Sequence, residues 1–376
     1  MLKQKFISIL CISFIAVLLV QCKKKKEEEA NPESSFDKTG MLANIGDSII
    51  IPAYSDFKIS IDSLKYFNDL FAAAPSLINL TNVQNRFLHA YTSYQNLSAF
   101  EFGPADNELI RANFNTFPCD TIQINSKIAV GDFNFSTVAD LDAKGFPAID
   151  FLLYGSIQDN NSVLIKFTTD ANAVNRKNYL TALVTELKSK TDIVNTAWSG
   201  SGGNYIATFK SNTGTNVGSS IGMLVNQLNY DLEFLKNLKI GIPLGKKSMG
   251  TILPNKAEAV YSTESLMLAK EQLKSLENIY LGRNVQNIDG LGLDDYLAHL
   301  AAQHSSGPLN DVIKSKFISA KIKLAAIPET LSQTILSNPN VVDSAYAELQ
   351  QLVVLLKVDM SSAMGILITY QDNDGD

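Results

Sequence analysis

The chain has few of the residues that bind metals through sulfur or nitrogen. Its 376 residues include three cysteines and three histidines. Three cysteines cannot make a disulfide framework or a thiolate zinc site. His299 and His304 are five residues apart in a segment that we expect to be helical, so they would point about 140° apart. His89 stands alone, and we expect structural or surface roles for all three histidines.

A basic surface is also missing. There are 38 acidic residues against 32 basic ones, which gives a net charge of −6 and excludes the class of nucleic-acid-binding proteins that use a basic stripe. The sequence has no HExxH, CxxC, Walker or GxSxG motif. No serine or cysteine nucleophile can be identified, because nothing marks a base beside one.

The first 21 residues are predicted to be a lipoprotein signal peptide. Lys3 and Lys5 precede an apolar run, Phe6–Val20, whose fifteen residues are fewer than the about 20 needed to cross a membrane as a helix. The next residues, Leu19–Cys22, resemble a bacterial lipobox, with Gln21 in place of the usual small residue. We therefore expect a lipid anchor at Cys22.

That anchor predicts a location in the cell envelope. The protein would be attached to the outer membrane, on its periplasmic face or at the cell surface, and the membrane would be its first partner. Loss of residues 1–21 removes two lysines and no acid, so the mature charge becomes 30 − 38 = −8. Residues 22–40 carry a charge run and few apolar residues, which predicts a flexible tether.

Helical periodicity dominates the rest of the chain. Apolar residues recur every three or four positions, for example at Leu180, Leu183, Val184 and Leu187. Pro52 predicts a kink or a fresh helix start, and only residues 120–130 and 366–370 alternate as short strands would. Gly, Ser and Asn gather around residues 199–219. We predict an all-α fold of two four-helix-bundle-like domains packed side by side, residues 41–205 and 206–376.

Two carboxylates stand in unusually apolar surroundings. Glu101 lies within the aromatic sequence Phe100–Pro104, which includes Gly103 and Pro104. Asp150 lies within the apolar run 145–155, after Pro147, which suits the first turn of a helix. Such carboxylates must be paired, hydrogen-bonded or protonated, so both are candidate ligand or metal-binding residues. A structural cap or ion pair is an equally open interpretation.

The end of the sequence is acidic. Asp372, Asp374 and Asp376 alternate around a glycine, as at the start of a calcium-binding loop, but the distal glutamate of such a loop is absent. Asp372 and Asp374 are therefore candidate cation ligands, and an acidic tail without a site is the alternative.

Several segments in the same order resemble the imelysin family, bacterial envelope proteins that are sometimes catalogued as insulin-cleaving membrane proteases. The resemblance covers about residues 41–376. The segments that carry it are Ile51–Tyr54, Phe100–Ala105, Phe117–Pro118, Gly145–Gly155, Leu224–Gly245 with Asn226, Leu291–Asp294 and Ile368–Asp376.

The resemblance implies a fold of two similar helical bundles with a site where they meet. The hallmark motif of the family, GxHxxE, is proposed to bind metal. Here its glycine is Gly145, its histidine position holds Pro147 and its glutamate position holds Asp150. Proline has no donor atom, and a zinc peptidase needs about three protein ligands, so the resemblance does not carry over a peptidase site.

The family is also associated with iron acquisition, and one relative is a component of an elemental iron-uptake system. The leading hypothesis is a non-catalytic envelope lipoprotein that binds a metal or small ligand between its domains and serves iron uptake, with iron-uptake components as partners. Asp150, Glu101, Asp372 and Asp374 could bind iron or calcium through oxygen. The alternatives are a metallopeptidase of the imelysin type and a helical scaffold that docks an envelope partner.

Overall fold

The structure is a computed structural model that describes residues 35–155, 159–328 and 330–370. Within these ranges helices dominate and almost no strand occurs, which confirms the all-α class. The strands of this part of the chain are β1 (Gln303–His304) and β2 (Gly307–Pro308), paired antiparallel. Cys22, Asp372 and Asp374 lie outside the described residues. Lys38 begins one compact unit that includes all later described residues, and the division into two bundles at residue 205 stays a prediction.

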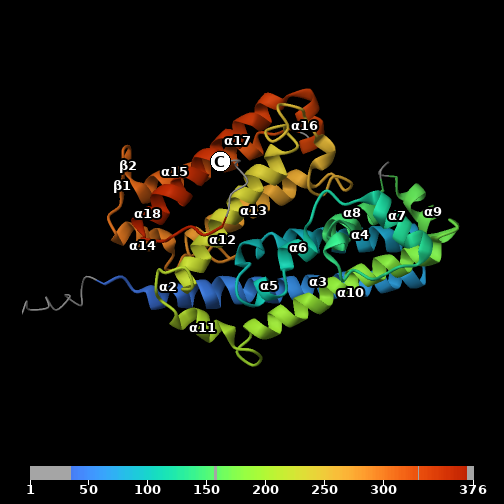
Figure 1. Cartoon of the computed structure of the whole chain (residues 1–376), viewed down its shortest axis with the longest axis horizontal. Helices are drawn as coiled ribbons and strands as arrows, with labels where there is room; N and C mark the ends of the chain where they lie inside the picture. The colour runs from blue at the N-terminus through green and yellow to red at the C-terminus, as the bar shows by residue number, and fades with distance from the viewer. Residues whose placement is uncertain (1–34, 156–158, 329, 371–376) are drawn as a thin grey trace, which may run out of the picture. The chain divides into compact units, whose positions relative to one another are not determined.

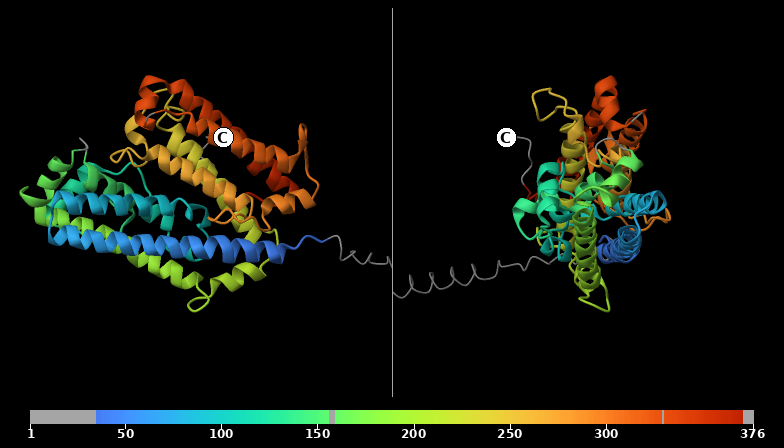
Figure 2. Two further views of the ribbon diagram at one scale, coloured as in Figure 1. Left: turned by 180° about the vertical axis from the view of Figure 1, so that it is seen from behind. Right: turned by 90° about the vertical axis from the view of Figure 1, so that its right-hand side faces the viewer.

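Three long helices form the first half of this unit. They are α3 (Ile51–Ala73), α4 (Leu77–Tyr94) and α10 (Ala173–Trp198). Helix α3 packs against both of the others (Figures 1 and 2). Each turns its apolar stripe inward, so that Leu80, Phe87 and Leu183, for example, are fully or almost fully buried.

The chain enters α3 through α2 (Lys38–Asn44) and a π-helical turn, η2 (Ile45–Ile50). The backbone stays right-handed helical from η2 into α3, so Pro52 follows the π-helical turn without a break in the helix. The fresh helix start, one of the two outcomes predicted beside this proline, is therefore wrong, and the irregularity is the π-helical turn before it.

Short elements connect α4 to α10 and on to the second half. They are η3 (Ser98–Phe100), α5 (Pro104–Asn107), α6 (Ile110–Phe114), α7 (Thr121–Val130), η4 (Val138–Ala143), α8 (Gly145–Tyr154), α9 (Asn160–Thr168) and, after α10, α11 (Tyr205–Ser211). The strand predicted for residues 120–130 is wrong, because this segment is helix α7. Asp120 caps that helix by accepting hydrogen bonds from the N–H groups of Ile122 and Gln123, at 2.8 and 3.0 Å.

The second half is built on α12, α13, α15 and α17, with α15 packed against both α13 and α17 (Figure 1). Its elements are α12 (Ser220–Phe234), η5 (Leu235–Gly241), η6 (Pro254–Lys256), α13 (Ser265–Tyr280), α14 (Leu293–His299), α15 (Leu309–Ala325), α16 (Leu331–Ser337), α17 (Pro339–Val354), η7 (Leu355–Met360) and α18 (Ser361–Ala363). His299 ends α14 and His304 lies in β1, so the single helical segment predicted for both is wrong. Among the described residues, every helix is too short or too polar to cross a membrane.

An aromatic cluster centred on Phe146 fills the core of the first half. The Phe146 ring stacks on Tyr91 at 4.5 Å between ring centres, and the rings of Phe57, Phe87 and Phe114 lie 6.1 to 6.3 Å away. All of these side chains are fully or almost fully buried. This cluster fixes helix α8, and with it the motif-like segment that begins at Gly145.

Candidate functional site

The motif-like segment, residues 145–150, is held in place by close packing. Its third position, however, has no atom that could bind a metal. Gly145 has a φ of +69°, and a Cβ atom on it would lie 2.4 Å from the carbonyl oxygen of Phe114, so only glycine fits there. Pro147 is the third residue of α8, as predicted for a first turn, and is buried. It offers no side-chain donor atom, so this position cannot ligate a metal.

Asp150 is a buried anchor for a distant loop. Its side chain is 1% exposed, and its two carboxylate oxygens accept hydrogen bonds from the backbone N–H groups of Tyr261 and Ser262, at 2.9 and 3.0 Å. Burial raises the pKa of Asp150 to about 7, against the lowering effect of these hydrogen bonds. Because Tyr261 and Ser262 precede α13, Asp150 ties α8 to the start of that helix.

Glu101, the other predicted carboxylate, lines a cavity. It follows η3, is 9% exposed, and accepts a hydrogen bond at Oε1 from the backbone N–H of Arg111, at 3.0 Å. Burial raises the pKa of Glu101 to about 7, although the charge of Arg111 opposes the rise. The following Gly103 has a φ of +55°, and a Cβ atom there would overlap the ring of Tyr205, so the aromatic sequence needs this glycine.

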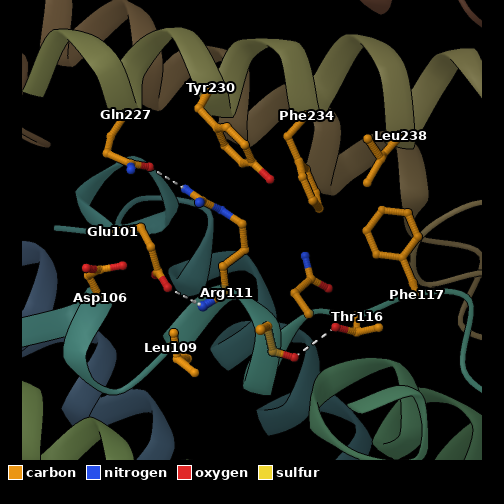
Figure 3. Close-up of a pocket in the computed structure, with 12 residues that line it drawn as sticks. Glu101, Asp106, Leu109, Arg111, Thr116, Phe117, Gln227, Tyr230, Phe234 and Leu238 are labelled. Atoms are coloured by element: carbon orange, nitrogen blue, oxygen red, sulfur yellow. Dashed lines mark hydrogen bonds between the residues drawn. The ribbon is translucent and has the colours of Figure 1, made fainter. Parts of the chain in front are cut away.

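We call this space the Glu101 cavity. Its volume is about 450 Å³, and it lies between the segment 101–117 and the face of α12 and η5 (Figure 3). Polar side chains gather at one end and aromatic rings at the other. The lining residues are Glu101, Asp106, Leu109, Arg111, Ala112, Asn115, Thr116, Phe117, Gln227, Tyr230, Phe234 and Leu238. A volume of this size suits a small ligand.

Arg111 is the one cationic side chain in this lining, and other groups of the protein already pair with its charge. The Nη2 atom of Arg111 donates hydrogen bonds to the carbonyl of Ser98 and to Oε1 of Gln227, at 2.8 and 3.1 Å. Its guanidinium also lies 4.5 Å from the ring centre of Tyr230 and 3.8 Å from the carboxylate of Asp231, which is 1% exposed. The charges left over in the cavity are therefore those of Glu101 and Asp106.

A network of buried polar side chains lies behind the wall of the cavity. Asp231 accepts hydrogen bonds from Ser98 and Gln272, both at 2.7 Å. Lys239 and Glu258, almost fully buried, form an ion pair at 2.8 Å. Asn115, a lining residue, donates to Glu258 at 2.7 Å.

The sequence patterns did not predict this network, although one signal for it is visible in the sequence. Asp231 lies three residues after Leu228 and four before Leu235, so it falls on the apolar stripe of its helix. A charge on an apolar stripe has to find a buried partner. Arg111 and Glu258 carry no such signal, because their segments are short and have no clear period.

Asn226 fixes the last described segment of the chain. Its Nδ2 atom donates to the carbonyl of Leu367 at 3.0 Å, and its Oδ1 atom accepts from the N–H of Thr369 at 2.8 Å. Residues 366–370 form neither helix nor strand. Tyr370 then packs edge-on against Tyr230 of the cavity wall, with 5.3 Å between ring centres. Asn226 therefore guides the chain toward the Glu101 cavity.

The described residues do not assemble the predicted metal ligands into one site. Asp150 is not among the cavity residues, Glu101 is, and Asp372 and Asp374 lie outside the described ranges. Within those ranges there is no group of three or more His, Cys, Asp or Glu side chains that could hold a metal ion.

Comparison with known proteins identifies similar chains. The family model for imelysin matches residues 50–358. Iron-regulated protein A of Synechococcus elongatus is 23% identical over 300 residues, which cover 78% of this chain and 76% of that protein.

Two solved structures share the fold. One is a candidate iron-regulated protein A precursor from Parabacteroides distasonis, with a TM-score of 0.70 and 18% identity over 86% of this chain and 94% of that one. The other is an imelysin-like protein from Psychrobacter arcticum, with a TM-score of 0.65 and 17% identity over 89% of this chain and 97% of that one.

The raised pKa of Glu101 predicts a specific dependence of stability on pH. Between about pH 4.5 and about pH 7 the unfolded chain loses this proton while the folded chain keeps it. The free energy of unfolding of the wild type should therefore fall, relative to Glu101→Gln, by on the order of 2–3 kcal/mol across this range and then level off. Urea unfolding followed by circular dichroism measures the difference.

The matched control is Thr116→Val, an uncharged change in the same cavity. The difference in the free energy of unfolding between Thr116→Val and the wild type should stay constant over the same pH range. A constant difference between wild type and Glu101→Gln would show that Glu101 titrates alike in both states.

Proposed function

Because the chain belongs to the imelysin family, we propose that it is an exported, non-catalytic envelope protein that serves iron uptake and binds its cargo in the Glu101 cavity. The family resemblance expected from the sequence is thereby confirmed. The cargo, the anchor and the role in iron uptake are the proposal.

The observation that carries the proposal is that the carboxyl groups lining the Glu101 cavity have no ion-pair partner in the described part of the chain. Glu101 is nine-tenths buried and accepts one hydrogen bond, from a backbone N–H, while Asp231 neutralises Arg111. Asp106 adds a second carboxylate to the lining. Such a cavity favours a positively charged cargo, and hard cations prefer oxygen ligands.

Iron is the cation that the relatives indicate. Two of the similar proteins carry the description iron-regulated protein A. The word precursor in one of these descriptions supports export. The names alone do not say how iron would be held, so the ligand atoms have to be inferred from this chain.

The C-terminal acids are the natural source of further oxygen ligands. Tyr370 packs against Tyr230, which lines the cavity. Asp372 follows two residues later in the sequence, and two residues span at most about 7 Å. We therefore propose Glu101, Asp372 and Asp374 as cargo ligands. We leave Asp150 out, because both of its oxygens are used by backbone N–H groups.

The position of Pro147 favours cargo binding over peptide cleavage. A zinc peptidase needs about three protein ligands and an activated water. In the part of the chain that the structure describes, Pro147 offers no ligand atom, Asp150 is enclosed, and no cluster of three metal-binding side chains occurs.

Calorimetry with Fe²⁺ tests the proposal on residues 23–376, which include the compact unit that starts at Lys38. Under anaerobic conditions, Glu101→Gln and deletion of residues 371–376 should each weaken binding by about tenfold or more, which is about 1.4 kcal/mol. Binding to the wild type should tighten as the pH rises through about 7, because the proton must leave Glu101 first.

Asp106→Asn is the matched control, since it removes one exposed carboxylate from the same cavity. It should weaken Fe²⁺ binding by less than about threefold. Failure of the wild type to bind Fe²⁺, or equal affinities in all four proteins, would contradict the proposed site. Calcium is titrated in parallel, and tighter binding of Ca²⁺ than of Fe²⁺ would reassign the cargo.

An assay with unfolded casein separates this proposal from a metallopeptidase. The wild type should show no cleavage above background with Zn²⁺, Mn²⁺, Fe²⁺ or Ca²⁺. Metal-dependent cleavage that is lost in both Asp150→Asn and Glu101→Gln, with circular dichroism spectra unchanged, would overturn the non-catalytic assignment. Two variants are used because Asp150→Asn also weakens a structural anchor.

Metabolic labelling with a palmitate analogue tests the lipid anchor. The full-length chain should take up the label, and Cys22→Ser should abolish it, because the lipid of a lipobox protein is attached through the thiol of this cysteine. Cys119→Ser is the control and should keep the label. An unlabelled wild type, or a labelled Cys22→Ser, would remove the anchor from the proposal.

A further inference from the structure

A second cavity has the opposite charge to the first. It measures about 380 Å³ and lies between α13, the loop that follows it, and α15. Its lining contains four basic side chains and one acidic one, in a chain whose net charge is −6. The lining residues are Lys270, Leu273, Lys274, Glu277, Asn278, Arg283, Asn287, Lys321 and Leu324. We call this space the Lys270 groove, and it shares no residue with the Glu101 cavity.

Glu277, the one acidic residue in the lining of the Lys270 groove, already has an ion-pair partner. Glu277 is 8% exposed and pairs with the ammonium of Lys321 at 2.5 Å. A carboxylate held in this way neutralises one cation and leaves three others around the groove.

Two of those three cations, Lys274 and Arg283, are weakly paired. Lys274 lies 3.3 Å from Glu271, and the Lys274 side chain is 53% exposed, while Arg283 lies 3.5 Å from Asp289. Exposed pairs of this kind contribute little free energy, so a ligand can replace the partner at small cost. Lys270 makes no ion pair within the described part of the chain. Positive charge without a strong acidic partner is therefore concentrated in the Lys270 groove.

An adjoining cavity of about 300 Å³ has a balanced lining of three basic and three acidic side chains. It shares Glu277, Arg283 and Lys321 with the Lys270 groove and adds Lys314, Asp289 and Asp294. Lys314 is held at 2.6 Å by the carboxylate of Asp294, which is 5% exposed. The excess of positive charge is therefore confined to the Lys270 groove.

The donors of the groove match the oxygens of an anion. A guanidinium offers two parallel N–H groups to a phosphate or carboxylate, and each lysine adds a point charge. The amides of Asn278 and Asn287 can add neutral donors, and Leu273 and Leu324 give the groove an apolar floor. Its volume falls within the range of small-molecule sites.

We propose that the Lys270 groove binds a small multivalent oxyanion, a molecule that carries phosphate groups or several carboxylates. The anion bridges Lys270 and Lys274 on one turn of α13 to Arg283 in the loop after it. The two sources of such a group in an envelope are a soluble anion and the headgroup of an anionic lipid.

Two binding measurements on residues 23–376 distinguish these sources. Calorimetry with inorganic pyrophosphate tests the soluble anion, and co-sedimentation with phosphatidylcholine vesicles that contain about a quarter phosphatidylglycerol tests the headgroup. The double variant Lys270→Gln/Lys274→Gln should weaken binding by about tenfold or more in the arm that binds, and added salt should weaken it further.

The matched control is Lys65→Gln/Lys166→Gln, which removes two positive charges from α3 and α9. It should change the affinity by less than about twofold. Arg283→Gln provides a second groove variant should the lysine double variant not fold, which thermal unfolding reports. No binding in either arm, or equal losses in the groove and control variants, would overturn the proposal.

Discussion

The ion pair between Lys239 and Glu258 is the interaction on which the rest of the site depends. Both side chains are at most 2% exposed, and isolated charges at such positions would cost several kcal/mol each. Each charged group of the pair also makes a hydrogen bond with a neutral side chain from the first half of the chain. Gln95 accepts from Lys239 and Asn115 donates to Glu258, both at 2.7 Å. The pair therefore joins η5 and the segment before α13 to the end of α4 and the end of α6.

The segment that contains Glu258 is held a second time, by Asp150. Three and four residues beyond Glu258, the backbone N–H groups of Tyr261 and Ser262 donate hydrogen bonds to Asp150. The acid of the motif-like segment therefore serves as an anchor, and Pro147 fits that role because it pre-forms the first turn of α8. With both oxygens of Asp150 bonded in this way, Glu101 is the predicted carboxylate that lines a cavity.

The sequence was sufficient for the features that depend on local pattern. The apolar stripes predicted the helices, and a carboxylate inside an apolar or aromatic run predicted that Glu101 and Asp150 are buried. The strand expected at residues 120–130 failed because Ile122, Ile124 and Ile128 are spaced by even numbers, as in a strand, whereas Ile124 and Ile128 are also four residues apart and form the buried face of helix α7. The cap at Asp120 favours the helix. Which distant groups meet Arg111 and Glu258 depends on tertiary packing, so local pattern could not supply their partners.

Helix α13 lies between two cavities whose linings differ in charge, and screening explains how both can occur in an acidic protein. Gln272 reaches Asp231 behind the Glu101 cavity, whereas Lys270 and Lys274 line the Lys270 groove. A helix with its side chains is about 10 Å across. The Debye length at physiological salt is about 8 Å, so exposed charges beyond the helix have little effect on a ligand in the groove. The surplus of acids elsewhere therefore does not cancel the local attraction for an anion. The affinity that each cavity can offer a ligand depends on the few charged side chains that line it. Among these, the ones that already have an ion-pair partner within the protein contribute less.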